Sequence, residues 1–146
     1  MFKLLHPNEL QLSKMIWEEM RAHAEQQAPE EACGLLAGEM EAQQYRVRTI
    51  IPTTNALHSQ VRYRIDPPEQ LKAFEQIEEL GWELVGIYHS HPNGPDAPSP
   101  TDVSEAYYPE AVYLIWSHRT GEWNCRGFLI QDGNIDEVTH TVREQT

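Results

Sequence analysis

The sequence has few cysteines, few basic residues and no long apolar run. Its two cysteines, Cys33 and Cys125, are too few for a disulfide framework, and neither lies in a Cys-x-x-Cys pair. The 146 residues contain 11 Lys and Arg against 23 Asp and Glu, which gives a formal net charge of −12 at pH 7. Such a surface repels phosphate backbones and argues against a nucleic-acid partner. Because no run of about 18 apolar residues occurs, we expect no membrane span.

The beginning of the chain lacks the basic start and the apolar core of a signal peptide. Together with the scarce cysteines, this predicts a cytoplasmic protein with reduced thiols. The hydrophobic share of 40% is enough for a packed core, and the length suits one domain over residues 1–146.

Apolar periodicity predicts helices and strands in a mixed order. The helices are expected over 13–27 and 67–80, with a short third one beginning near Pro100 and ending before Pro109. Strands are expected over 32–37, 45–52, 61–66, 82–89, 111–117, 122–131 and 134–142. This order is not a regular βαβ repeat, so it predicts an α+β fold with a mixed sheet flanked by helices.

Two patterns within these elements make sharper predictions. In the helix over 67–80, the spacing predicts a buried stripe that includes Leu71 and Ile77. In the strand over 82–89, alternation predicts that Val85, Ile87 and His89 share one face.

Two histidines lie at the end of that strand: His89 is its last residue, and His91 follows with one residue between them. In an extended backbone residues i and i+2 point the same way, about 7 Å apart, so both imidazoles can converge on one cation. A lone His-x-His also fits exposed or hydrogen-bonded histidines. Asp102 strengthens the metal interpretation, because three protein ligands with an open fourth position are typical of a catalytic zinc site.

Ser99 has two compatible interpretations. In "SPTD" it reads as the N-cap of a helix, with Pro100 at the first position and Asp102 reaching back to the cap. Such a capped terminus would also hold Asp102 rigidly at a metal. The Ser99 hydroxyl could then donate to a developing oxyanion.

A hydrolytic site also needs a general base, and the residues leave three candidates. Asp96 lies in the loop itself but has the setting of a turn residue. Glu30 and Glu31 precede the strand over 32–37, where an acidic residue is often only a solvated strand end. Spacing alone does not choose among them.

Four elements in order resemble the signature of the JAMM (MPN+) metalloprotease family. They are Glu31-x-x-Gly34, then "HSHP" from His89, then seven residues counted from Pro92, then "SPTD" from Ser99. The resemblance implies that His89, His91 and Asp102 bind one Zn²⁺ per chain with a catalytic water. It further implies Glu31 as general base and Ser99 as oxyanion stabiliser.

The resemblance also implies a fold and a substrate class. The fold would be a mixed, partly barrel-like sheet flanked by helices, the MPN/JAMM architecture, which is cytidine-deaminase-like. The family typically cuts peptide or isopeptide bonds after the Gly-Gly tail of a ubiquitin-like protein. The short loops are similar to those of compact prokaryotic members, whose substrates are sulfur-carrier proteins, so we expect precursor processing or release of an attached amino acid such as cysteine. Asn55 is expected to hydrogen-bond near the site.

Other functions fit the residues less well. The alternative within the family is a non-catalytic MPN-type scaffold that binds a ubiquitin-like partner, and the complete ligand set argues against it. A nucleoside deaminase would need His-x-Glu and Pro-Cys-x-x-Cys, and the sequence has neither. A phage-tail endopeptidase that carries a second hydrolase domain does not fit the length.

Overall fold

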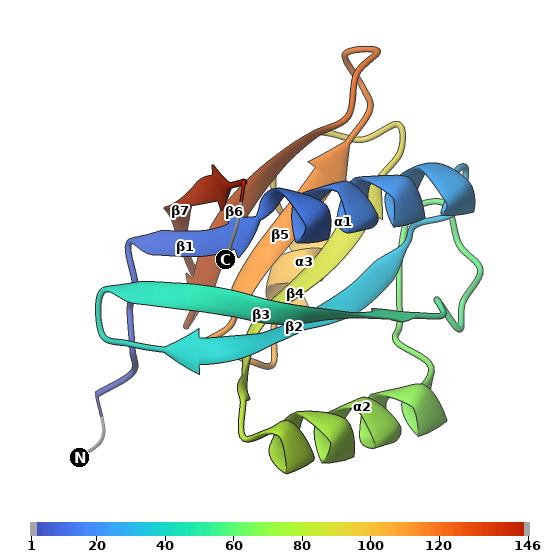
Figure 1. Cartoon of the computed structure of the whole chain (residues 1–146). Helices are drawn as coiled ribbons and strands as arrows, with labels where there is room; N and C mark the ends of the chain where they lie inside the picture. The colour runs from blue at the N-terminus through green and yellow to red at the C-terminus, as the bar shows by residue number, and fades with distance from the viewer. Residues whose placement is uncertain (1–2, 145–146) are drawn as a thin grey trace.

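Residues 3–144 form seven strands and three helices in the computed structural model, which describes that range (Figure 1). The first two and last two residues of the expected 1–146 domain lie outside it. No helix formed by these residues is long and apolar enough to cross a bilayer. In chain order the elements are β1 (Glu9–Ser13), α1 (Lys14–Gln27), β2 (Cys33–Met40), β3 (Gln44–Thr53), α2 (Pro67–Leu80), β4 (Glu83–His91), α3 (Pro100–Ser104), β5 (Val112–Ser117), β6 (Asn124–Gln131) and β7 (Asn134–Arg143).

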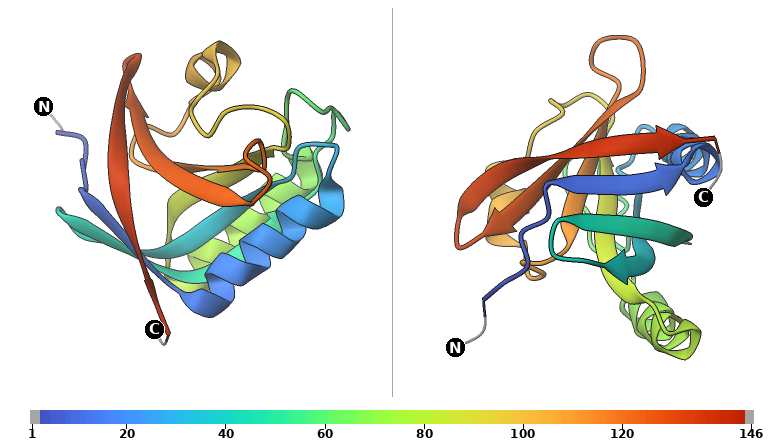
Figure 2. Two further views of the ribbon diagram at one scale, coloured as in Figure 1. Left: turned by 90° about the horizontal axis from the view of Figure 1, so that it is seen from above. Right: turned by 60° about the vertical axis from the view of Figure 1, so that its left-hand side comes forward.

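The strands close into a barrel in the order β1-β3-β2-β4-β5-β6-β7 (Figure 2). β4 and β5 pair in parallel, and so does β1 with both β3 and β7, while the remaining neighbours are antiparallel. The predicted α+β class and the barrel-like sheet are confirmed. The sequence did not predict β1, whose five residues are too few for a clear periodic signal, yet β1 is the strand that closes the barrel.

The helix ends follow from local chemistry. Ser13 caps α1, because its hydroxyl oxygen accepts a hydrogen bond from the Ile16 N–H at 3.2 Å. Asp66 caps α2 in the same way, two prolines occupy the first turn, and Gly81 ends the helix at a φ of +75°. The bounds predicted for α2 are therefore correct.

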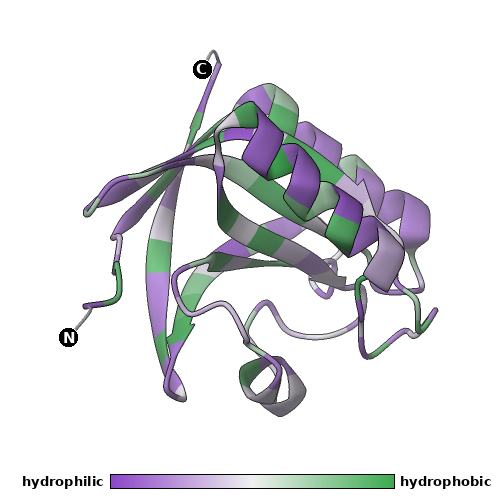
Figure 3. Ribbon diagram, turned by 90° about the horizontal axis from the view of Figure 1, so that it is seen from below, coloured by the Kyte–Doolittle hydropathy of each residue, from purple (hydrophilic) through white to green (hydrophobic). Residues whose placement is uncertain are grey.

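The sheet separates two hydrophobic clusters, and alternate residues of its strands belong to different clusters. Hydrophobic and hydrophilic residues alternate along the strands and along α1 in Figure 3. One cluster packs against α1, and it includes Tyr88, Leu114 and Trp116. The other includes residues of α2 and α3, together with Ile87 and Ile115 of β4 and β5. The site described below lies on this second side.

Three expectations about the elements were wrong. Residues 61–66 are not a strand: they belong to a loop in which Ile65 makes only an isolated bridge with Asn55. A register shift in the pairing of β2 with β4 places Val85 in the α1 cluster, opposite Ile87. The buried face of α2 carries Ala73 and Ile77, whereas Leu71 is 63% exposed.

Candidate metal centre and active site

The end of β4 brings the two predicted histidines together. His89 lies between Cys33 of β2 and Ile115 of β5 in the sheet register, so strand pairing on both sides fixes its position. His89 and His91 are both buried, and their Nε2 atoms are 3.1 Å apart. The expectation that the two rings converge is confirmed.

Asp102 in the first turn of α3 completes a three-atom cluster. Its Oδ2 atom lies 3.2 Å from Nε2 of His89 and 3.0 Å from Nε2 of His91. The same oxygen accepts a hydrogen bond from the Ser99 N–H at 2.9 Å, and Ser99 Oγ accepts one from the Asp102 N–H at 3.0 Å. This reciprocal pair is a capping box, so Ser99 is a helix cap and thereby holds Asp102 against the histidines.

His91 has a fixed proton position. Its Nδ1 lies 2.8 Å from the Pro95 carbonyl oxygen, and since a carbonyl only accepts, Nδ1 carries the hydrogen. In the neutral ring Nε2 then offers a lone pair to the cluster. The loop that carries Pro95 is itself held by Ser117, whose hydroxyl donates to the Gly94 carbonyl at 2.6 Å.

The cluster fits a metal ion. Its three edges are 3.0, 3.1 and 3.2 Å, close to the separation of about 3.3 Å between ligands held at about 2.0–2.1 Å in a tetrahedron. A carboxylate oxygen and an imidazole lone pair at such a distance repel unless a cation or a proton lies between them. His89 is 1% exposed, and its Nδ1 has no hydrogen-bond partner within residues 3–144, so neither neutral tautomer satisfies the ring.

Glu31 lies next to this cluster without joining it tightly. Its carboxylate, His89 and His91 have ligand atoms within 4.8 Å of one another, a looser grouping than the one made by Asp102. The residue is 3% exposed, and no group in the described part of the chain hydrogen-bonds to its Oε1 atom. A buried carboxylate oxygen without a partner is costly unless a water molecule or a ligand satisfies it.

The backbone around Glu31 is held by contacts from distant residues. The Glu31 N–H donates to the Ser59 carbonyl at 2.8 Å, and the Asn55 amide donates to the Glu31 carbonyl at 3.1 Å. The hydroxyl oxygen of Ser90, between the two histidines, accepts from the Ala32 N–H at 2.7 Å. The expected role of Asn55 near the site is therefore confirmed, and Ser90 ties the Glu31 segment directly to β4.

Close packing against β4 explains why the Glu31-x-x-Gly34 element ends in glycine. Gly34 pairs with Tyr88 of β4, and a Cβ atom at this position would overlap the Tyr88 ring. A larger residue would push β2 away from β4 and so move Glu31 relative to the histidines.

Burial acts differently on the two carboxylates. Burial raises the pKa of Glu31 to about 8, and the Asp102 charge adds to that rise while His91 opposes it. Burial alone would also raise the pKa of Asp102, but the contacts of its carboxylate with the His89 and His91 rings and the hydrogen bond from the Ser99 N–H hold that pKa well below its usual range. Asp102 is therefore ionised near neutral pH, whereas Glu31 in the metal-free protein can hold a proton.

The other candidates for the base are engaged elsewhere. Glu30 is only half-buried and lies 3.3 Å from Nδ1 of the exposed His58. Asp96 accepts hydrogen bonds from Asn124 at 2.7 Å and Arg126 at 3.1 Å, so it anchors the loop between β4 and α3. Of the three acidic candidates, only Glu31 is buried beside the histidines.

Tyr63 contacts the site, although the sequence did not predict it. Its ring stacks on His89 with the centroids 4.4 Å apart and an angle of 23° between the planes. The alternation over 61–66 suggested a strand, and no signal in the sequence shows that this loop folds back over the end of β4.

The remaining thiols and imidazoles stay outside the cluster. Cys33 is buried within 3.4 Å of the Thr53 hydroxyl, and burial raises the pKa of its thiol to about 11. Cys125 is also free and buried. Among residues 3–144, no grouping of metal-ligand type includes either cysteine or any further histidine. The two cysteines are therefore packing residues.

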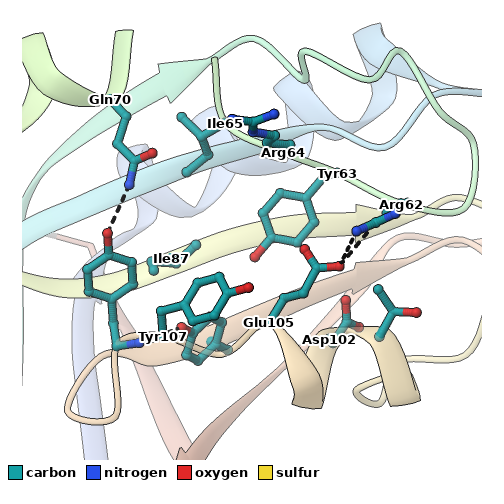
Figure 4. A pocket seen from close by; sticks show the side chains of 12 residues that line it. Arg62, Tyr63, Arg64, Ile65, Gln70, Ile87, Asp102, Glu105 and Tyr107 are labelled. Carbon is teal, nitrogen blue, oxygen red and sulfur yellow. Dashed lines mark hydrogen bonds and ion pairs between the residues drawn. The ribbon is translucent and has the colours of Figure 1, made fainter. Parts of the chain in front are cut away.

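Two cavities flank the cluster. The larger, about 450 Å³, is called the Asp102 cavity; the 54–66 loop lines one side and α3 the other (Figure 4). Arg62 crosses its mouth and pairs with Glu105 at 2.8 Å, as the dashed lines in Figure 4 show. The smaller, about 280 Å³, is called the Glu31 cavity, because Glu31 lines it together with His91 and Ser99.

Comparison with known proteins places the chain. Residues 13–128 match the model of the family described as prokaryotic homologs of the JAB domain. The chain belongs to the prokaryotic JAB-domain family. This membership confirms the JAMM/MPN+ resemblance. The matched range includes the five residues of the signature, which are Glu31, His89, His91, Ser99 and Asp102.

Its relatives in the JAB-domain family include named peptidases. The chain is 41% identical over 127 residues to the CysO-cysteine peptidase of Mycobacterium tuberculosis, covering 86% of each chain. It is 39% identical over 125 residues to the probable TtuB-protein conjugate cleaving protease of Thermus thermophilus, covering 85% of this chain and 78% of that protein. A solution structure from Desulfitobacterium hafniense superposes with a TM-score of 0.84 at 37% identity, covering 93% and 94% of the two chains.

Proposed function

We propose that this chain is a zinc-dependent metallopeptidase that hydrolyses the peptide or isopeptide bond after the Gly-Gly tail of a ubiquitin-like or sulfur-carrier protein. The observation that carries the proposal is the convergence of His89, His91 and Asp102 within 3.2 Å, with a buried carboxylate beside them. The named activities of the relatives support the peptidase class and the carrier substrate.

His89, His91 and Asp102 would hold the metal ion. Two imidazoles and one carboxylate make a borderline-hard ligand set, which favours zinc over magnesium or calcium. When bound, the ion supplies a Lewis acid that polarises the scissile carbonyl and lowers the pKa of a coordinated water. The capping box at Ser99 keeps the Asp102 carboxylate aimed at the histidines throughout.

Glu31 would act as the general base and then as the general acid. It takes a proton from the attacking water and returns it to the leaving amine. Burial favours a role in proton transfer, because a carboxyl group with a pKa raised toward neutrality can both accept and release a proton at working pH. The hydrogen bonds from Asn55 and to Ser59 hold its backbone in place during both transfers.

Ser99 would stabilise the negative charge that develops on the carbonyl oxygen. Its hydroxyl oxygen already accepts from the Asp102 N–H, so its hydrogen is free to donate into the Glu31 cavity, which Ser99 lines. The cap and the oxyanion role use different atoms of the same hydroxyl, so they do not compete.

The Asp102 cavity would hold the carrier tail. An extended tail ending in two glycines can lie along the backbone of residues 62–65, and glycines at its end allow the scissile carbonyl to approach the metal closely. We place the reaction in the cytoplasm, where the free, buried thiols of Cys33 and Cys125 would stay reduced.

The test combines metal content with cleavage. Purified protein is analysed by mass spectrometry for bound metal and incubated with a Gly-Gly-tailed carrier fused to a short peptide. The proposal expects one zinc per chain, cleavage after Gly-Gly, and loss of cleavage with a chelator that added zinc reverses. The Glu31→Gln variant is the matched control, because it should keep the zinc and lose the cleavage. A protein without stoichiometric zinc that only binds the carrier would be a scaffold instead.

A further inference from the structure

The leaving group of the proposed reaction can belong to either of two chemical classes. A single amino acid joined through its α-amine keeps a free carboxylate one carbon away from the scissile bond. A lysine side chain of a conjugated protein, joined in an isopeptide bond, presents four methylenes and no nearby charge. The two classes therefore require different surroundings on the side of the site where the amine leaves.

The position of Glu31 decides which cavity faces the leaving amine. Hydrolysis breaks the C–N bond, forms a C–O bond to water and moves one proton from that water to the nitrogen. Since Glu31 would carry this proton, the amine must leave on the side where Glu31 lies. Glu31 lines the smaller cavity and not the larger one, whereas Asp102 lines only the larger. The leaving group therefore lies in the Glu31 cavity and the acyl tail in the Asp102 cavity.

The residues that line the Glu31 cavity include no lysine or arginine that could pair with a carboxylate. Besides the three site residues, its lining comes from Gln60, Val61, Asn93, Gly94 and Pro95. None of these carries a positive charge, and Val61 is 82% exposed, so an apolar side chain borders the opening.

The nearest basic residues in the sequence are paired or lie at the Asp102 cavity. Arg62 follows Val61 but turns its guanidinium to Glu105 at 2.8 Å, across the mouth of the other cavity (Figure 4). Arg126 pairs with Asp96 of the loop between β4 and α3 at 3.1 Å and with Glu137 of β7 at 2.8 Å. Arg64 also lines the Asp102 cavity. The positive charges near the site thus lie on the acyl side or in existing ion pairs.

From this distribution of charge we infer that the chain releases the side-chain amine of a lysine in a conjugated protein, and not a single amino acid with a free α-carboxylate. The inference rests on the proposed function. The lysine methylenes would pack against Val61 and Pro95, and the amides of Gln60 and Asn93 would pair with peptide groups around the lysine. A free carboxylate in the same place would lose hydration without gaining an ion pair.

A matched set of substrates tests the inference on the zinc-loaded chain. One Gly-Gly-tailed carrier is joined to the α-amine of cysteine, a second to cysteinamide, and a third to the side-chain amine of lysine in a peptide with blocked ends. The first two differ only in the carboxylate. We expect kcat/KM for cysteinamide to exceed that for cysteine by about tenfold, because the buried carboxylate lacks a partner. The lysine peptide should be cleaved at least as well as cysteinamide.

Cysteine cleaved as fast as cysteinamide, or faster, would overturn the inference while leaving the proposed peptidase intact. Failure to cleave any of the three substrates would overturn the proposed function itself, and the inference with it.

A gain-of-function variant tests the same point from the protein side. Gln60 is exposed at the cavity, so Gln60→Arg adds the missing cation, and Gln60→Met serves as the uncharged control of similar length. The arginine should reduce the ratio of kcat/KM for cysteinamide to kcat/KM for cysteine by about threefold, which is the effect of a partly exposed ion pair. The methionine should leave this ratio unchanged. If the arginine leaves the ratio unchanged as well, the leaving group lies outside this cavity and the inference is overturned.

Discussion

Asp102 and Glu31 are both buried carboxylates beside the same two histidines, yet their surroundings push their pKa values in opposite directions. Asp102 lies against the His89 and His91 rings and accepts a hydrogen bond from the Ser99 N–H, and these contacts keep it ionised. Glu31 has no partner for its Oε1 within residues 3–144, and burial raises its pKa to about 8. The difference separates a permanent anion, suited to hold a cation, from a group that exchanges protons near neutral pH.

Removal of the Glu31 carboxylate tests whether Glu31 is the group that exchanges protons. Glu31→Gln should lower kcat by about 10²–10⁴-fold, the usual contribution of general acid–base catalysis, with metal content unchanged. Single-turnover cleavage of a carrier fusion measures the rate, and mass spectrometry measures the metal. Activity close to that of the original protein would remove Glu31 from the role of base.

Two substitutions at Ser99 separate its role as a helix cap from its role as an oxyanion donor. Ser99→Ala should lower kcat by about 10²–10³-fold, as the loss of one oxyanion donor does. Ser99→Gly is the matched control, because glycine at an N-cap costs only a few tenths of a kcal/mol and has no side-chain donor. Equal losses in both variants, with thermal stability preserved in the glycine variant, would support the oxyanion role; full activity in Ser99→Gly would assign Ser99 to capping alone.

The anionic side of the comparison is tested at Asp102. Asp102→Ala should weaken metal binding by more than about 100-fold, since even loss of an outer-shell partner costs about 10–100-fold. Competition with a fluorescent zinc chelator measures the affinity directly. Full metal occupancy in this variant at chelator concentrations that leave the original protein loaded would exclude Asp102 from the ligand set.

A smaller effect is expected on the stability of the metal-free protein. Glu31 has an ordinary pKa of 4.5 when unfolded and about 8 when folded, so between these values the folded chain keeps a proton that the unfolded chain has lost. Its contribution to stability is therefore present at low pH and is lost as the pH rises toward 8. The unfolding free energy of Glu31→Gln, measured relative to that of the original protein at the same pH, should therefore rise by up to about 3 kcal/mol from pH 5 to pH 8. Denaturant titrations in chelator measure this gain, and a pH-independent difference would contradict the raised pKa.

The parts of the site that the sequence predicted are local in the chain. His89 and His91 share a side because they lie two apart on one strand, and the capping box at Ser99 follows from four consecutive residues. Glu31 was different. Its spacing left Glu30 and Asp96 as equal candidates for the general base, and only the family resemblance selected Glu31. Its position depends on Asn55 and other residues far along the chain, whose contacts no local pattern encodes.

The same distinction applies to the fold. The α2 bounds were predictable because prolines and Gly81 mark both ends. The alternation over 61–66 misled because it reflects a loop with one side toward His89 and the other toward solvent, not a strand in the sheet. The closure of the barrel by β1 required a parallel pairing between β1 and β7, at opposite ends of the chain, which periodicity cannot reveal.

A crystal structure of the zinc-loaded protein, with the ion located by its anomalous scattering, would show which side chains bind the metal. We expect one zinc at about 2.0–2.1 Å from Nε2 of His89, Nε2 of His91 and Oδ2 of Asp102. The Glu31 carboxylate should lie farther away, separated from the ion by a water molecule. An ion bound directly by Glu31 and the two histidines, with Asp102 outside its coordination, would contradict the division of roles between the two carboxylates.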